Sequence, residues 1–284
     1  MDDRANGISV VIPAFNAAQF LPEAIASVRR QTIRVREIIV VDDGSRDGTH
    51  LVASRAGAQV MRQPNRGPAA ARNAGIHRAT GRWIAFLDAD DVWDPDKLEK
   101  QMLLAGTFRD VPVISCDRRT VRLKTDSTGN ARIIEASHFE TLDGYRRLVR
   151  RRKAMNSYLG RVTEDFVRSG CVLLPSTLLV RRSVFASVGL FARRLRGYED
   201  YEFLLRVLAV HPLGIVEQPL VTYRLHAANL HEDLDVMWVN ARRFERLVRA
   251  NPMHYPPGSL SALAWVSYLP LSAAAVRQAT STST

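Results

Sequence analysis

The chain has 284 residues, of which 46% are hydrophobic and 24% charged, a composition typical of a globular protein with a sizeable core. This composition excludes a disordered, collagen-like or disulfide-framed chain. No stretch approaches the ~18 apolar residues of a membrane span, and the first residues lack the pattern of a signal peptide, so we expect a cytoplasmic protein. Cys116 and Cys171 show no metal-type spacing, and we expect both to pack as small apolar side chains.

The whole chain has a formal net charge of +11, and most of this positive charge lies in the second half. Residues 1–144 contain 20 Lys and Arg against 19 Asp and Glu, whereas residues 145–284 contain 20 against 10. The two halves therefore carry about +1 and +10. A basic surface attracts nucleic acid, anionic lipid or an acidic substrate, or only keeps the protein soluble. Charge alone does not choose between these.

The first part of the chain repeats a strand, a loop and a helix. Residues 8–12 form a short β-branched run that Pro13 ends, and residues 17–31 carry apolar side chains at helical spacing. The same pattern predicts strands at 37–41, 58–61 and 83–87, and helices at 47–56 and 68–79. Strands without polar alternation, separated by helices, indicate a mostly parallel sheet with helices on both faces. We therefore predict an α/β half at residues 1–115, with ligands at the carboxyl ends of its strands.

The remaining sequence is less regular and forms an expected second half at 116–230. Within it, 117–160 has few apolar runs, so we expect an excursion or mobile segment there. Its basic cluster contains Arg146, Arg147, Arg150, Arg151, Arg152 and Lys153. The sequence then predicts strands at 176–180, 213–216 and 220–223 and a helix at 200–210. Residues 231–279 indicate two C-terminal helices, at 233–250 and 259–276, and 280–284 a disordered tail.

Acidic residues follow two of the predicted strands: Asp42 and Asp43 after the second, and Asp88, Asp90 and Asp91 after the fourth. An Asp after a strand commonly forms a turn or caps a helix. Two acidic clusters at one sheet edge, however, repel each other unless a cation, a hydrogen-bond donor or substrate charge compensates them. In extended geometry Asp88 and Asp90 lie on one side and make a partial oxygen site for Mg²⁺ or Mn²⁺. A metal-bound diphosphate is the matching ligand.

These motifs, in chain order, resemble those of the family 2 glycosyltransferases. The resemblance rests on residues 9–16, 41–45, 65–73, 86–91, 175–180, 189–191, 199–200 and 223–226, and covers roughly residues 7–230. It implies a GT-A fold, with a nucleotide-binding sheet flanked by helices and a smaller acceptor-binding second half. It also implies metal-dependent, inverting transfer of a hexosyl or N-acetylhexosaminyl group. The implied donor is a nucleotide sugar, with UDP expected, and the implied acceptor is a hydroxyl of a glycan or lipid-linked molecule.

The resemblance assigns a set of residues to the nucleotide. The set is Pro13, Phe15, Asn16, Asp43, Arg66, Arg72, Asp88 and Ala89. Phe15 matches a ring that stacks on the base, Asp43 a carboxylate that accepts the N3 hydrogen of uracil, and Asp88 a residue near the ribose. Arg66 and Arg72 are diphosphate partners or structural salt-bridge residues, and both interpretations stay open.

The same resemblance assigns the catalytic and metal-binding residues. Asp90 matches the ligand of the metal that bridges the donor diphosphate, and His226 a late residue near the diphosphate or metal. Asp200 matches the base that deprotonates the acceptor hydroxyl, although an Asp at a helix start can also be an N-cap. Glu199 is the next candidate for the base. A divalent cation would neutralise the leaving diphosphate by Lewis acidity.

Three other functions fit parts of the sequence. A nucleic-acid-binding module would explain the charge, but the acidic clusters would repel phosphates, so no nucleic-acid partner is expected. A dehydrogenase would need G-x-G-x-x-G after the first strand, where Pro13 and Ala14 stand instead. A nucleotidyltransferase on a related fold is the closest alternative enzyme. For 146–153, contact with an anionic inner membrane face, contact with an anionic acceptor and a merely solvated surface all remain open.

Overall fold

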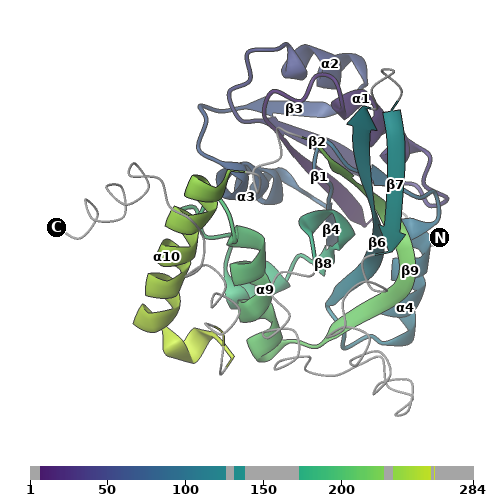
Figure 1. Cartoon of the computed structure of the whole chain (residues 1–284). Coiled ribbons are helices and arrows are strands. Elements are labelled where there is room, and N and C mark those ends of the chain that lie inside the picture. Colours follow the sequence, from purple (N-terminus) through teal and green to yellow (C-terminus); the bar gives the residue numbers. More distant parts are fainter. Residues whose placement is uncertain (1–6, 126–130, 138–172, 227–232, 257–258, 260–284) are drawn as a thin grey trace.

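The computed structural model describes residues 7–125, 131–137, 173–226, 233–256 and 259. Its first half alternates strands and helices, as the sequence predicts (Figure 1). The elements are β1 (Ile8–Ala14), α1 (Leu21–Arg29), β2 (Glu37–Asp42), α2 (Thr49–Arg55), β3 (Gln59–Arg62), α3 (Pro68–Arg78) and β4 (Trp83–Phe86). The β-branched strands and amphipathic helices therefore form within a few residues of their predicted bounds.

The later elements include several that the sequence pattern did not predict. They are β5 (Val92–Trp93), α4 (Lys97–Thr107), β6 (Val113–Thr125), β7 (Ala131–Ser137), the 3-10 turn η1 (Pro175–Thr177), β8 (Leu179–Arg181), α8 (Val184–Val188), α9 (Glu199–Val210), β9 (Leu213–Leu225), α10 (Leu234–Ala250) and η3 (Pro252–His254). Among the described residues, no helix is both long and apolar enough to cross a membrane.

One sheet runs through both halves of the described chain, in the order β3-β2-β1-β4-β8-β6-β9-β5, with β7 beside β6. The first four strands are mutually parallel, as predicted. Strand β8 is antiparallel to β4 and β6, while β6 and β9 are parallel. The complete sheet is therefore mixed. Ala14 at the end of β1 lies opposite Asp42 at the end of β2, so these carboxyl ends share one edge.

Helices cover both faces of the sheet, and the strand side chains alternate between two hydrophobic cores (Figure 1). Val11 belongs to the core under α3, α8, α9 and α10, and Val10 to the core under α1, α2 and α4. In the first core the rings of Phe86 and Phe203 both contact Phe191, with centroid separations of 5.4 and 4.5 Å. This aromatic cluster fixes the start of α9 against the end of β4.

The second half requires four corrections to the sequence prediction. The strand expected at 176–180 is η1 followed by β8. The two strands expected at 213–216 and 220–223 are the single strand β9, whose pairing with β6 shifts register beside Asp117. The expected boundary at 115/116 falls inside β6.

The fourth correction concerns the expected excursion at 117–160, because residues up to 125 and from 131 to 137 pair as β6 and β7. Its remainder, including the basic cluster at 146–153, lies outside the described residues, as do Cys171, most of the helix expected at 259–276 and the tail at 280–284. Cys116 is buried, as predicted.

Candidate active site

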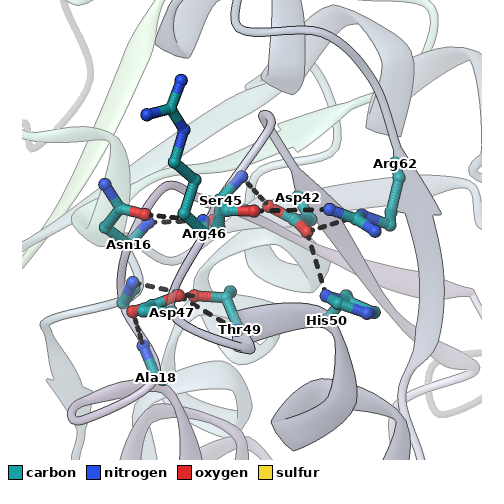
Figure 2. A network of polar contacts seen from close by, with 10 residues as sticks. Asn16, Ala18, Asp42, Ser45, Arg46, Asp47, Thr49, His50 and Arg62 are labelled. Carbon is teal, nitrogen blue, oxygen red and sulfur yellow. Dashed lines mark hydrogen bonds and ion pairs between the residues drawn. The ribbon is translucent and has the colours of Figure 1, made fainter.

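The loop after β2 is organised by Asp42, whose side chain is buried (Figure 2). Its Oδ1 accepts from the Ser45 amide at 2.8 Å, and its Oδ2 accepts from Arg62 Nε at 3.0 Å. Asn16 binds the same loop. Its side-chain Oδ1 accepts from the Arg46 backbone amide at 3.0 Å, and its backbone amide donates to Ser45 Oγ at 2.9 Å. Asp42 and Asn16 therefore shape the turn that carries Asp43.

Asp43 organises the neighbouring loop between β3 and α3. Its Oδ1 accepts from Gln63 Nε2 at 2.7 Å and the Arg66 amide at 2.9 Å, and its Oδ2 accepts from the Gly67 amide at 2.8 Å. Gly67 has φ 87, a left-handed conformation that favours glycine. The Asp43 side chain is buried. Phe15, just beyond β1, is 51% exposed, so an accessible aromatic ring lies at this edge of the sheet. Pro13 lies within β1, opposite Val41.

Ser176 joins two backbone segments at the acidic loop after β4. Its Oγ accepts from the Asp88 amide at 3.0 Å and donates to Asp91 Oδ2 at 2.5 Å. Asp91 is fully buried, and burial together with the nearby charges of Asp90 and Asp88 raises its pKa well above the ordinary value. Asp91 is therefore structural, while Ala89 is the buried residue between Asp88 and Asp90. Sequence reasoning missed Ser176, because its partners lie 85 and 88 positions away.

Asp90, in the loop after β4, and His226, just past the end of β9, come together. His226 Nε2 lies 3.0 Å from Asp90 Oδ2, and the imidazole stacks on the Phe20 ring with centroids 4.7 Å apart. Burial raises the pKa of Asp90 and the charge of Asp88 raises it further, while His226 opposes the shift. Within the described part of the chain, no group of three or more His, Cys, Asp or Glu is placed to hold a metal. The pair can therefore supply part of a metal site and would need further ligands from elsewhere.

Arg72 connects the acidic loop to α9. Its Nη2 donates to Asp88 Oδ1 and its Nη1 to Glu199 Oε1, both at 2.7 Å, and only 4% of the residue is exposed. Burial lowers the pKa of Arg72, but the attraction of Asp88 and Glu199 outweighs it and the net shift is upward. Burial also raises the pKa of Glu199 to about 7, against the opposing charge of Arg72. Of the two interpretations of Arg72, the structure gives the salt-bridge arrangement.

Helix α9 begins with Glu199 and Asp200 in clearly different surroundings. The preceding Tyr198 has φ 65 and ψ 6 and occupies the N-cap position, so Asp200 is not the N-cap. Asp200 Oδ1 accepts from the Tyr201 amide at 2.7 Å and the residue is only partly buried, whereas Glu199 is buried against Arg72. Of the two carboxylates, Asp200 is therefore the more accessible to a substrate.

Comparison with known proteins identifies the family and the fold of the chain. The family model described as Glycosyl transferase family 2 matches residues 9–168. An uncharacterized glycosyltransferase of Rickettsia prowazekii is 28% identical over 242 residues, which make up 81% of this chain and 70% of that protein. The structure of the mannosyltransferase PcManGT from Pyrobaculum calidifontis, solved with GDP-Man and Mn²⁺, has a TM-score of 0.63 at 18% identity. The match covers 98% of this chain and 76% of that one.

TarS 1-349 of S. aureus, solved with UDP-GlcNAc, has a TM-score of 0.61 at 17% identity, and the match covers 85% of this chain and 66% of that one. These two likenesses show the fold, and the match over residues 9–168 shows the family. The chain has the GT-A fold and belongs to glycosyltransferase family 2.

Proposed function

We propose that this protein is a metal-dependent, inverting glycosyltransferase that moves a sugar from a nucleoside diphosphate sugar to an acceptor hydroxyl. The observation that carries the proposal is the double contact of Arg72, which bonds to Asp88 and to Glu199 at 2.7 Å each. It places the acidic loop after β4 beside the first turn of α9. The proposed donor site and the candidate base would therefore lie side by side.

The nucleotide would bind over the loops that follow β1 and β2. The exposed Phe15 ring offers a stacking surface for a base, and the loops that Asp42, Asp43 and Asn16 hold give this surface a fixed frame. PcManGT binds GDP-Man and TarS binds UDP-GlcNAc, which supports a nucleoside diphosphate sugar without choosing its base. UDP remains our first candidate, with a hexose or N-acetylhexosamine as the sugar.

Asp90 and His226 fit a divalent cation by the chemistry of their donor atoms. A carboxylate and an imidazole at 3.0 Å suit Mn²⁺, and the carboxylate alone suits Mg²⁺. The remaining ligands would come from water and the donor diphosphate. When bound, such a cation neutralises charge on the leaving diphosphate. The Mn²⁺ in PcManGT supports this assignment.

Asp200 would serve as the general base. Its partly exposed carboxylate would accept the proton of the acceptor hydroxyl as that oxygen attacks the anomeric carbon from the face opposite the leaving group. Buried Glu199 would hold Arg72, and through it Asp88, in place. The acceptor would be a glycan or a lipid-linked molecule. Membrane contact through residues 146–153 stays a prediction that liposome cosedimentation can check.

Product analysis separates this proposal from a nucleotidyltransferase. The protein is incubated with UDP- and GDP-sugars, a mixture of glycan acceptors and Mn²⁺, and the released phosphates are identified. Free nucleoside diphosphate together with a glycosylated acceptor supports sugar transfer. Release of pyrophosphate would instead assign the site to nucleotidyl transfer.

A further inference from the structure

A rigid loop leads into the candidate base. At its start the Asn73 side chain accepts from the Phe191 amide at 3.0 Å and donates to the Phe191 carbonyl at 2.9 Å. Near its end the Arg196 amide donates to Asn240 Oδ1 at 2.7 Å, and Leu195 between these anchors is 1% exposed. Both asparagines are buried. The backbone just before α9 is therefore fixed in position.

This loop carries three arginines, Arg193, Arg194 and Arg196, whose side chains are all exposed. We call these three residues the arginine loop. Within the described residues none of their guanidinium groups has a hydrogen-bond or carboxylate partner, in contrast to the paired Arg72 and Arg119. Three like charges within four residues repel one another unless an anion compensates them.

The arginine loop lies beside the loop that Asp43 organises. A Cβ placed on Gly67 would lie 3.2 Å from Arg196 Cγ, so the stem of Arg196 passes directly over Gly67. Arg66, next to Gly67, also exposes a guanidinium without a partner among the described residues. Arg66 therefore adds a fourth positive side chain next to the arginine loop. Glu199 and Asp200 follow Arg196 by three and four positions.

We propose that the arginine loop binds an anionic glycan acceptor through its phosphate or carboxylate groups, an inference that rests on the proposed transferase function. Arginine presents a planar fork of donors that matches both anions. The donor diphosphate is assigned to the side of Asp88 and Asp90, and Arg72 lies between Asp88 and Glu199. The arginine loop runs into the Glu199 end of that bridge. An anion held there places a neighbouring hydroxyl near Asp200.

The test compares two triple variants of the whole chain. One is Arg193→Gln, Arg194→Gln, Arg196→Gln. The control is Arg29→Gln, Arg30→Gln, Arg34→Gln, which removes the same charge from exposed residues at the end of α1 and in the loop before β2. Binding of polyphosphate, polygalacturonate, neutral dextran and phosphatidylglycerol vesicles is measured at several salt concentrations. UDP and GDP binding with Mn²⁺ is measured in parallel.

Three lost charge contacts should weaken binding of at least one polyanion by about tenfold in the arginine-loop variant only. Any binding of dextran should be the same with and without the arginines, and nucleotide binding should match the wild type in both variants. Equal weakening in the control would reduce the effect to net charge and overturn the proposal. So would unchanged polyanion binding, or a loss seen only with phosphatidylglycerol vesicles, which would indicate membrane contact. If the wild type binds neither nucleotide, the transferase function fails independently.

Discussion

Arg72 and Glu199 are 127 positions apart in the sequence, and a buried hydrogen bond of 2.7 Å joins Arg72 Nη1 to Glu199 Oε1. The other terminal nitrogen of the same guanidinium bonds to Asp88. One side chain of α3 thus connects the loop after β4 with the start of α9. The relative position of donor-side and base-side carboxylates depends on this bridge.

Replacing Arg72 should destabilise the fold strongly. Arg72→Gln leaves buried Glu199 without its cation, and breaking a buried pair costs about 3–5 kcal/mol of the free energy of unfolding. Arg78→Gln, at an exposed position of the same helix, should change it by less than about 0.5 kcal/mol. Urea denaturation of both variants checks this. Equal stability of Arg72→Gln and the wild type would mean that the bridge contributes nothing to the free energy of unfolding.

Stability should depend on pH through Glu199. The folded protein raises the pKa of Glu199 from 4.5 to about 7, so between these values the folded state binds more protons than the unfolded state. The stabilisation from the bound proton is complete below pH 4.5 and is lost as pH rises to 7. From pH 4.5 to 8 the wild type should therefore lose about 3 kcal/mol of its free energy of unfolding relative to Glu199→Gln. A difference that does not vary with pH would contradict the raised pKa.

The sequence predicted the first half of the fold well, because its strands are uninterrupted β-branched runs. Helix α4 was missed because its buried face is partly polar. Lys97 is fully buried, lies 4.1 Å from the Trp93 ring centroid and donates to Gln101 Oε1, and Gln101 in turn donates to the Thr177 carbonyl at 2.8 Å. These contacts satisfy polar side chains where the helical pattern requires apolar ones, so the periodicity is broken.

The candidate site was predicted as a list of residues but not as a network. Motif positions located the carboxylates, because Asp residues after strands are visible in sequence. Ser176 supplies hydrogen bonds that fix the acidic loop, and Phe20 supplies the ring on which His226 stacks; the partners of both residues are more than eighty positions away. Such contacts depend on the folded sheet order, which local patterns do not encode.

The two acidic residues at the start of α9 should respond differently to substitution. Asp200→Asn should lower the transfer rate by about 10²–10⁴ and leave donor binding unchanged, because only the base is lost. Glu199→Gln keeps a hydrogen-bond acceptor for Arg72 and should retain more activity. Single-turnover rates and donor titration of both variants decide this. If Asp200→Asn turned over like the wild type, Glu199 would become the candidate base.

Ser176 should support the acidic loop. Ser176→Ala removes the donor to buried Asp91 Oδ2 and the acceptor for the Asp88 amide, which costs about 1–3 kcal/mol of the free energy of unfolding. Nucleotide affinity should fall as well, because the Asp88 backbone loses its anchor. Ser187→Ala, at an exposed serine of α8, is the matched control and should change neither quantity. Identical nucleotide affinity in both variants would separate Ser176 from the donor site.

The central claim is that the edge carrying Asp90 and His226 binds a nucleoside diphosphate together with a divalent cation. Calorimetric titration of UDP and GDP into wild type and Asp90→Asn, with Mn²⁺ and with EDTA, tests it most directly. The wild type should bind at least one nucleotide with Mn²⁺ and bind it much more weakly in EDTA, because no divalent cation then lies between the diphosphate and the Asp90 carboxylate. Asp90→Asn should lose most of the gain that Mn²⁺ provides. Equal nucleotide affinity in all four combinations of protein and medium would contradict the account.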